Sequence, residues 1–98
     1  MTDELEMKQP EWVTENEDGN FTIKTKEGDF IFEEKTGDVV ERVNKLSEKS
    51  GKDVESLLIT RSAVEPKITD DDLGKLKGST YLRLKYGISF VYGLQDFV

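Results

Sequence analysis

The chain has 98 residues, which is enough for one domain with one modest hydrophobic core. Its net charge of −7 argues against direct binding to nucleic acid or to an anionic membrane, because both carry negative charge themselves. It contains no cysteine and no histidine, so disulfides, thiolate chemistry and histidine-based catalytic triads are excluded.

The acidity is concentrated in the first third of the chain. Up to Glu34 there are eleven acids and three lysines, whereas the remainder carries ten acids and eleven bases. Residues 1–11 show no hydrophobic periodicity and no basic region followed by an apolar stretch. They are therefore predicted to be an acidic flexible tail and not a signal peptide. Residues 12–98 are predicted to form a single α+β domain.

A β-hairpin is the first predicted element, after a turn or loop in the sequence ENEDGN. Phe21 and Ile23 alternate with polar residues, and Phe30 and Phe32 resume the alternation after a short glycine-bearing turn. We expect these four side chains to face the core. An isolated hairpin is marginally stable in water, so helices must cover that face.

Two helices are predicted next. The first begins at a cap formed by Thr36 or Asp38 and ends at Ser50-Gly51, with its apolar residues on one stripe. The second is expected from about Lys52 to Val64, with Asp53 as its cap.

A third, short helix is predicted to begin at Thr69 and to end at Gly78. The aspartates that follow the cap, Asp70 to Asp72, suit the positive end of a helix. They lack the ligand spacing of a calcium-binding loop, so they are interpreted as helix-start residues and not as a metal site.

The final helix is predicted from about Tyr81 to Gln95, capped by Ser79 or Thr80. At 100° per residue, one face carries Leu84, Ile88 and Val91, and a neighbouring face carries Leu82, Tyr86, Phe90, Leu94 and Phe97. This apolar arc is wider than the stripe of a surface helix, so the helix is expected to be strongly apolar.

Two interpretations of the wide apolar arc stay open. The whole arc is buried inside the domain, or one part of it meets a partner or a second copy, as aromatic residues often do. Gly87 and Gly93 are expected to leave notches where another backbone approaches. The partner-binding residues predicted from this helix are Tyr81, Tyr86, Phe90, Tyr92, Leu94 and Phe97.

The sequence offers little reaction chemistry. No phosphate-binding loop is present, and the carboxylate pairs fall on an alternating strand or in a turn, where solvated surface is expected. The chain is therefore predicted to be no enzyme and to need no cofactor or metal. No apolar run approaches the ~20 residues that a membrane span needs.

The order of these features resembles that of a known family. GNFTIKTKEGDFIFEEKTGDVVERV places a hairpin and a Thr-Gly-Asp turn directly before a helix. LLITRSAVEPKITDDDLGKLKGSTYLRLKYGISFVYGL adds a proline-containing link, a Thr-Asp-Asp-Asp-Leu helix start and the last helix. Together, over about Gly19 to Leu94, they resemble the tail assembly chaperones of long-tailed bacteriophages.

The resemblance implies a non-enzymatic assembly factor of the host cytoplasm. Its partner would be the long helical tape-measure protein, with the tail tube subunit as a second one. Two alternatives stay open: a small phage structural or head/tail-completion protein, and an acidic protein-interaction domain that mimics nucleic acid. Self-association into a homo-oligomer is also left open.

Overall fold

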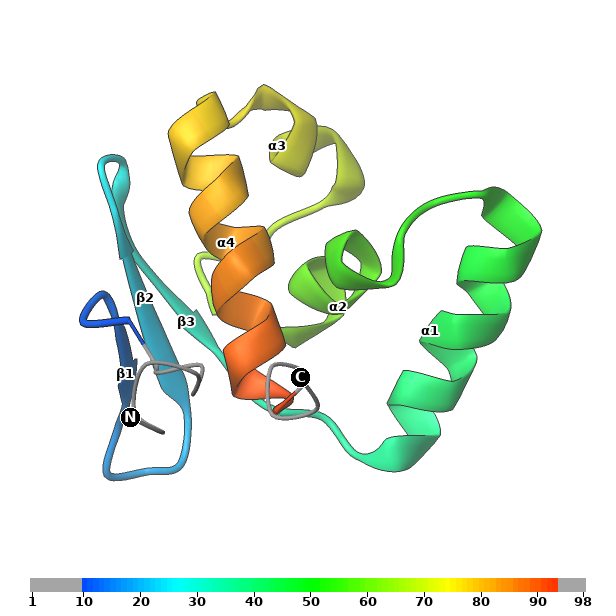
Figure 1. The fold of residues 1–98 in the computed structure, drawn as a ribbon, viewed down its shortest axis with the longest axis horizontal. Helices are drawn as coiled ribbons and strands as arrows, with labels where there is room; N and C mark the ends of the chain where they lie inside the picture. Colours follow the sequence, from blue (N-terminus) through cyan, green and yellow to red (C-terminus); the bar gives the residue numbers. More distant parts are fainter. Residues whose placement is uncertain (1–9, 94–98) are drawn as a thin grey trace, which may run out of the picture.

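A four-stranded sheet and four helices make up the part of the chain that the computed structural model describes, residues 10–93 (Figure 1). The elements are, in chain order, β1 (Val13–Glu15), β2 (Phe21–Thr25), β3 (Gly28–Phe32), α1 (Gly37–Ser50), α2 (Val54–Ser62), β4 (Ala63–Glu65), α3 (Asp70–Lys75) and α4 (Gly78–Val91). The predicted α+β class, with a hairpin followed by short helices, is confirmed. The acidic tail predicted for residues 1–11 lies, except for its last two residues, outside the described range, as do Leu94 and Phe97.

The predicted hairpin is β2 paired with β3. Phe21 lies opposite Phe32 and Ile23 lies opposite Phe30, so all four side chains share one side of the sheet, and all four are buried. Gly28 follows the turn with a φ of +117°, a conformation that costs glycine little and other residues much. The alternation in the sequence therefore placed both the strands and their buried side correctly.

The sheet has two strands that the sequence did not predict. β1 pairs antiparallel with β2 and brings Val13 opposite Ile23. β4 pairs with β3, the second strand of the hairpin, so the spatial order is β1-β2-β3-β4. The second predicted helix was expected to run to Val64, but α2 ends at Ser62 and the chain becomes extended there. Both missed strands are three residues long, too short for a period-2 pattern to develop.

The helix caps follow the sequence in α1, α2 and α3. Gly51 closes α1 with a φ of +78°, and the Asp53 carboxylate accepts a hydrogen bond from the Ser56 backbone N–H at the start of α2. At α3, Thr69 and Asp72 form a reciprocal capping box. The hydrogen bonds from the Thr69 backbone and side chain hold the pKa of Asp72 below its ordinary value.

The boundary between α3 and α4 differs from the prediction. Gly78 was expected to end the third helix and Ser79 or Thr80 to cap the last one, but Gly78 opens α4 and Lys77 is its N-cap, with no side-chain cap bond. α4 also ends at Val91, before the predicted Gln95. Thr80 is not the residue that precedes the helix, as an N-cap would be. It lies inside the first turn of α4 and is buried.

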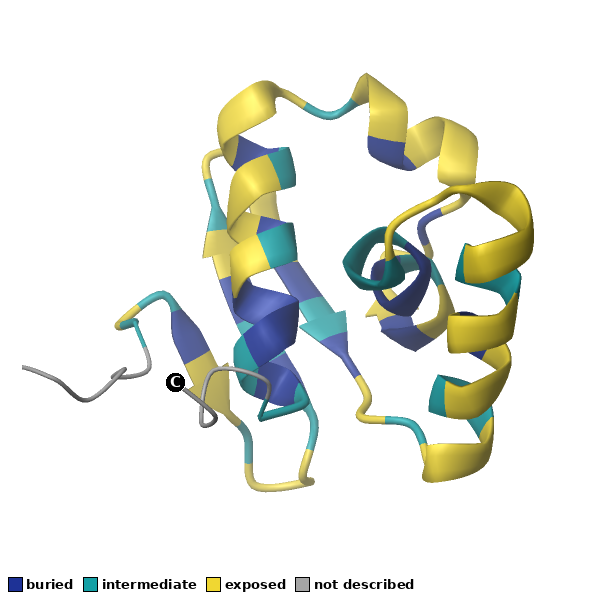
Figure 2. Cartoon of the chain, turned by 45° about the vertical axis from the view of Figure 1, so that its right-hand side comes forward, coloured by how far each residue is buried: buried dark blue, intermediate teal, exposed yellow. Residues whose placement is uncertain are grey.

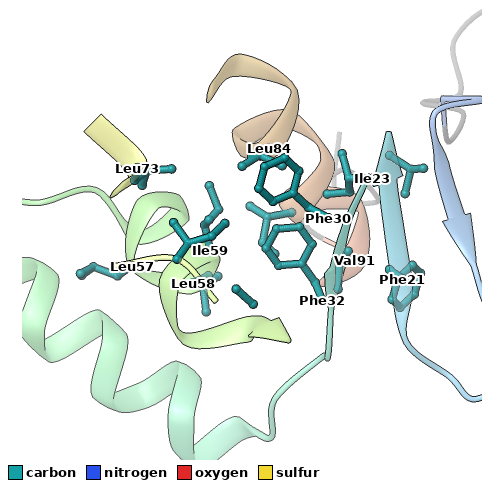
Figure 3. Packing of buried hydrophobic residues seen from close by; sticks show 14 of the residues in the cluster. Phe21, Ile23, Phe30, Phe32, Leu57, Leu58, Ile59, Leu73, Leu84 and Val91 are labelled. Atoms are coloured by element: carbon teal, nitrogen blue, oxygen red, sulfur yellow. The ribbon is translucent and has the colours of Figure 1, made fainter. Parts of the chain in front are cut away.

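The core lies between one face of the sheet and the helices α4 and α2 (Figures 1 and 3). Phe30 and Phe32 project from the sheet toward Leu84 of α4 and Ile59 of α2 (Figure 3). α1 packs on α2, on the side away from the sheet (Figure 1), and most of its surface is exposed (Figure 2). α4 therefore has the sheet on one side and α2 on the other, which fixes the face it leaves open.

Candidate protein-binding surface

α4 has one closed and one open face. Leu84 and Ile88 are fully buried. Leu82 is 65 % exposed and Tyr86 is 43 % exposed, on the neighbouring face that the sequence left open between burial and partner contact. In Figure 2 the buried and exposed stretches alternate along α4 accordingly. Exposed apolar side chains mark a binding surface when they form a contiguous patch, so their neighbours decide the interpretation.

Aromatic rings extend the open face toward the sheet. The ring of Tyr86 packs edge-on against Phe90 at 5.3 Å between centroids, and against Trp12, which leads into β1, at 5.9 Å. We call Leu82, Tyr86, Phe90 and Trp12 the α4 strip. Phe90 and Trp12 are half-buried against the core, so the strip stands on packed side chains and is held in place.

Arg83 lies at the edge of the strip next to the sheet. Its guanidinium group is 4.9 Å from the centre of the Trp12 ring, a cation–π contact. One of its N–H groups donates to the backbone carbonyl oxygen of Lys24 in β2 at 2.9 Å. Within residues 10–93 this arginine forms no ion pair. It is thus oriented by the fold while its charge is left without a partner there.

The opposite edge of the strip, next to α2, is built differently. A shallow hollow of about 300 Å³ lies between Leu82, Tyr86 and Glu55. Lys85, which also lines it, forms a 3.0 Å ion pair with Asp53. Partial burial raises the pKa of Asp53, but the hydrogen bonds from Lys85 and Ser56 outweigh this effect, so the pKa of Asp53 is lowered. The hydrogen bond between Lys85 and Asp53 raises the pKa of Lys85. The cation on this side is therefore already satisfied.

Comparison with known proteins gives no role for this surface. No family model, no curated protein and no solved structure matches the chain. The role of the α4 strip has to be inferred from its side chains and their charges.

Two of the predicted partner-binding tyrosines lie away from the strip. The Tyr81 hydroxyl is 3.3 Å from the Ser56 hydroxyl in α2, and the Lys85 ammonium lies over the Tyr81 ring. The Tyr92 hydroxyl accepts a hydrogen bond from the Lys35 backbone N–H at 2.9 Å and lies 2.6 Å from the Ser62 hydroxyl. Both tyrosines therefore join α4 to other elements, and Tyr86 and Phe90 are the predicted residues that the fold places on the open face.

Replacing Tyr92 by Phe should lower the free energy of unfolding by about 1–3 kcal/mol. The change removes the hydroxyl that bonds Lys35 and leaves the fully buried Ser62 hydroxyl without this partner. Urea denaturation measures the loss. Tyr86→Phe is the matched control, since the Tyr86 hydroxyl makes no hydrogen bond to any residue from 10 to 93; equal effects of the two changes would contradict the structural role given to Tyr92.

The notch predicted at Gly87 is filled by the chain itself. A Cβ atom at this position would lie 2.6 Å from Cδ1 of Ile23 and 3.3 Å from Cζ3 of Trp12. The missing side chain therefore lets α4 approach β2 closely. Gly93 has a φ of +70° and serves the turn at the end of α4.

Two of the three aspartates that follow Thr69 interact with neighbouring residues. Asp70 forms an ion pair with Lys52 at 2.9 Å, and Asp72 belongs to the capping box. Among the described residues no three acidic side chains gather where they could hold a metal ion. The search for a membrane-crossing helix, limited to the same residues, finds none of sufficient length and apolar character.

Three residues of this surface, Leu82, Trp12 and Arg83, were not among the predicted partner-binding residues. Leu82 lies on the same helical face as Tyr86 and Phe90, and this shared face was the available signal. Trp12 and Arg83 come together only because β1 and β2 lie beside α4. No local pattern connects residues so far apart in the sequence.

Proposed function

We propose that this chain is a non-enzymatic protein-binding module that holds an apolar helix of another protein on the α4 strip. The observation that carries the proposal is the exposure of Leu82 and Tyr86 beside Trp12, on a helix whose other face is fully buried. Tyrosine, tryptophan and arginine dominate the binding energy of protein interfaces. An amphipathic helix that lays its apolar side on such a strip buries both surfaces from water.

The specific role we propose is that of a phage tail assembly chaperone acting in the host cytoplasm. Support for it comes from the resemblance in the order of hairpin, capped helices and last helix. In this role the helix on the strip belongs to the tape-measure protein, and the tail tube subunit is a second partner. The excess of acids outside α4 supports the role physically, because net charge keeps a loaded complex dispersed.

Co-expression with the tape-measure protein of the same phage tests this function. The wild-type chain should keep the tape-measure protein in the soluble fraction, and Leu82→Asp combined with Tyr86→Asp should abolish that effect. A carboxylate in place of each apolar side chain would have to be desolvated by the bound helix, at a cost of several kcal/mol.

The control is Val64→Asp, which adds a carboxylate at a large exposed apolar residue of β4, away from the strip. It should protect the tape-measure protein as the wild type does. Circular dichroism establishes that the double variant is folded. A folded double variant that still protects would show that the strip is not the binding site, and a wild type that fails to protect would refute the chaperone role.

A further inference from the structure

The segment that contains α4 differs in charge from the rest of the chain. Residues 73–93 include Lys75, Lys77, Arg83 and Lys85 and no acid, whereas the remaining residues carry ten bases and twenty-one acids. Within residues 10–93 the α4 strip therefore has a free cation, Arg83, on its sheet side, whereas its α2 side has Glu55 beside the Lys85–Asp53 ion pair. A partner with acidic residues is repelled by most of this molecule and attracted at the Arg83 edge of the strip.

Among these four cations, Arg83 is the one placed to receive a carboxylate at the strip. Lys85 is committed to Asp53, and the charges of Lys75 and Lys77 act on the carboxylates of Asp72 and Glu27. Arg83 uses one N–H group for the Lys24 carbonyl oxygen and rests on the Trp12 ring. Its other N–H groups keep the fork geometry that matches a carboxylate with two hydrogen bonds.

The orientation of Arg83 is set before any partner arrives. An arginine free in solvent loses rotamer freedom when it forms an ion pair, which is why most surface pairs contribute little. The Trp12 ring and the Lys24 carbonyl already restrict Arg83. A carboxylate that binds here therefore meets a preorganised donor.

We infer that Arg83 determines which helix the α4 strip accepts, and that this helix carries an acidic residue directly beside its apolar stripe. The inference depends on the proposed binding role of the strip and adds the chemistry of the partner. The apolar stripe lies on Leu82 and Tyr86, and the flanking carboxylate binds Arg83. The α4 helix of a second copy offers Arg83 no carboxylate, because α4 contains no acidic residue.

Two synthetic helical peptides with the same leucine stripe test the inference. In one the stripe is flanked by glutamates and in the other by lysines, and neither contains Trp or Tyr. Trp12 is the only tryptophan of the chain and belongs to the strip, so its emission reports binding, with each variant compared to its own unbound state. We expect the glutamate peptide to bind the full wild-type chain about tenfold or more tighter than the lysine peptide.

Charge reversal should exchange the preference. Arg83→Glu should bind the lysine peptide more tightly than the glutamate peptide, and Arg83→Lys should retain only part of the wild-type preference because an ammonium lacks the planar fork. Lys75→Glu is the control: it changes the net charge equally, lies in α3 away from the strip, and should leave the wild-type preference in place.

The outcomes separate this inference from the proposed function. If both peptides bind equally, Arg83→Glu changes nothing and Leu82→Asp with Tyr86→Asp still abolishes binding, the strip binds helices without regard to their charge and the role of Arg83 is refuted. If neither peptide binds at all, the proposed function of the strip fails, and the inference fails with it.

Discussion

Replacing Leu84 by Ala should lower the free energy of unfolding by about 2–5 kcal/mol. The Leu84 side chain is fully buried and lies close to Phe30 in the core between the sheet and the helices (Figure 3). Truncation to Ala removes its apolar contacts and leaves a cavity that the neighbouring rings fill only partly. For a chain of this size the midpoint of thermal unfolding should fall by roughly 4–8 °C for each kcal/mol lost.

Leu82→Ala is the matched control for this prediction. It is the same change on the same helix, two residues earlier, at a side chain that is 65 % exposed. We expect it to alter the free energy of unfolding by no more than about 0.5 kcal/mol. Urea denaturation of both variants measures the difference. Similar losses would mean that the Leu82 side of α4 is covered in the isolated chain, and the α4 strip would then not be available to a partner.

The sequence predicted the elements whose pattern is local. β2 and β3 alternate with period 2 around a glycine-bearing turn, and their buried residues are those the alternation selects. Asp53, Thr69 and Gly51 are residue types that cap helices through bonds within a few positions, so each end could be predicted from its own neighbourhood.

The elements that the sequence did not predict depend on distant partners. β1 and β4 have three residues each, and they are strands because β2 and β3 offer them unpaired edges. Nothing in the residues Ala63 to Glu65 themselves marks an end of α2, so the predicted helix ran on to Val64. Similarly, Gly78 follows the common pattern for a helix end, yet it opens α4, the helix that buries Leu84 in the core.

The binding surface was predicted only in part, for the same reason. Helical periodicity separated the Leu84 face from the Tyr86 face, and the structure buries Leu84 and Ile88 of the first and exposes Leu82 and Tyr86 of the second. Periodicity could not tell Tyr86 from Tyr92, whose hydroxyl turns inward because Ser62 and the Lys35 N–H lie within reach. Distinguishing a structural tyrosine from an exposed one requires knowing which element packs beside it.

The close approach of α4 to the sheet leads to a second prediction with a large effect. Gly87→Ala should destabilise the chain by a net of up to ~2 kcal/mol, although Ala is favoured over Gly by ~1 kcal/mol in a helix. The new Cβ would lie 2.6 Å from Cδ1 of Ile23, which is itself fully buried. Overpacking of this kind forces side chains from their preferred rotamers, at a cost of typically 1–3 kcal/mol.

Gly74→Ala in α3 separates the two contributions. It is the same substitution in a helix, but its Cβ would have no atom within 4 Å, so only the gain in helix propensity of up to about 1 kcal/mol remains. The two variants should therefore shift the urea midpoint in opposite directions. Stabilisation by both would show that α4 stands further from β2 than these distances imply. Trp12, which lies 3.3 Å from the added atom at Gly87, would then lose its fixed place beside Tyr86 and Arg83.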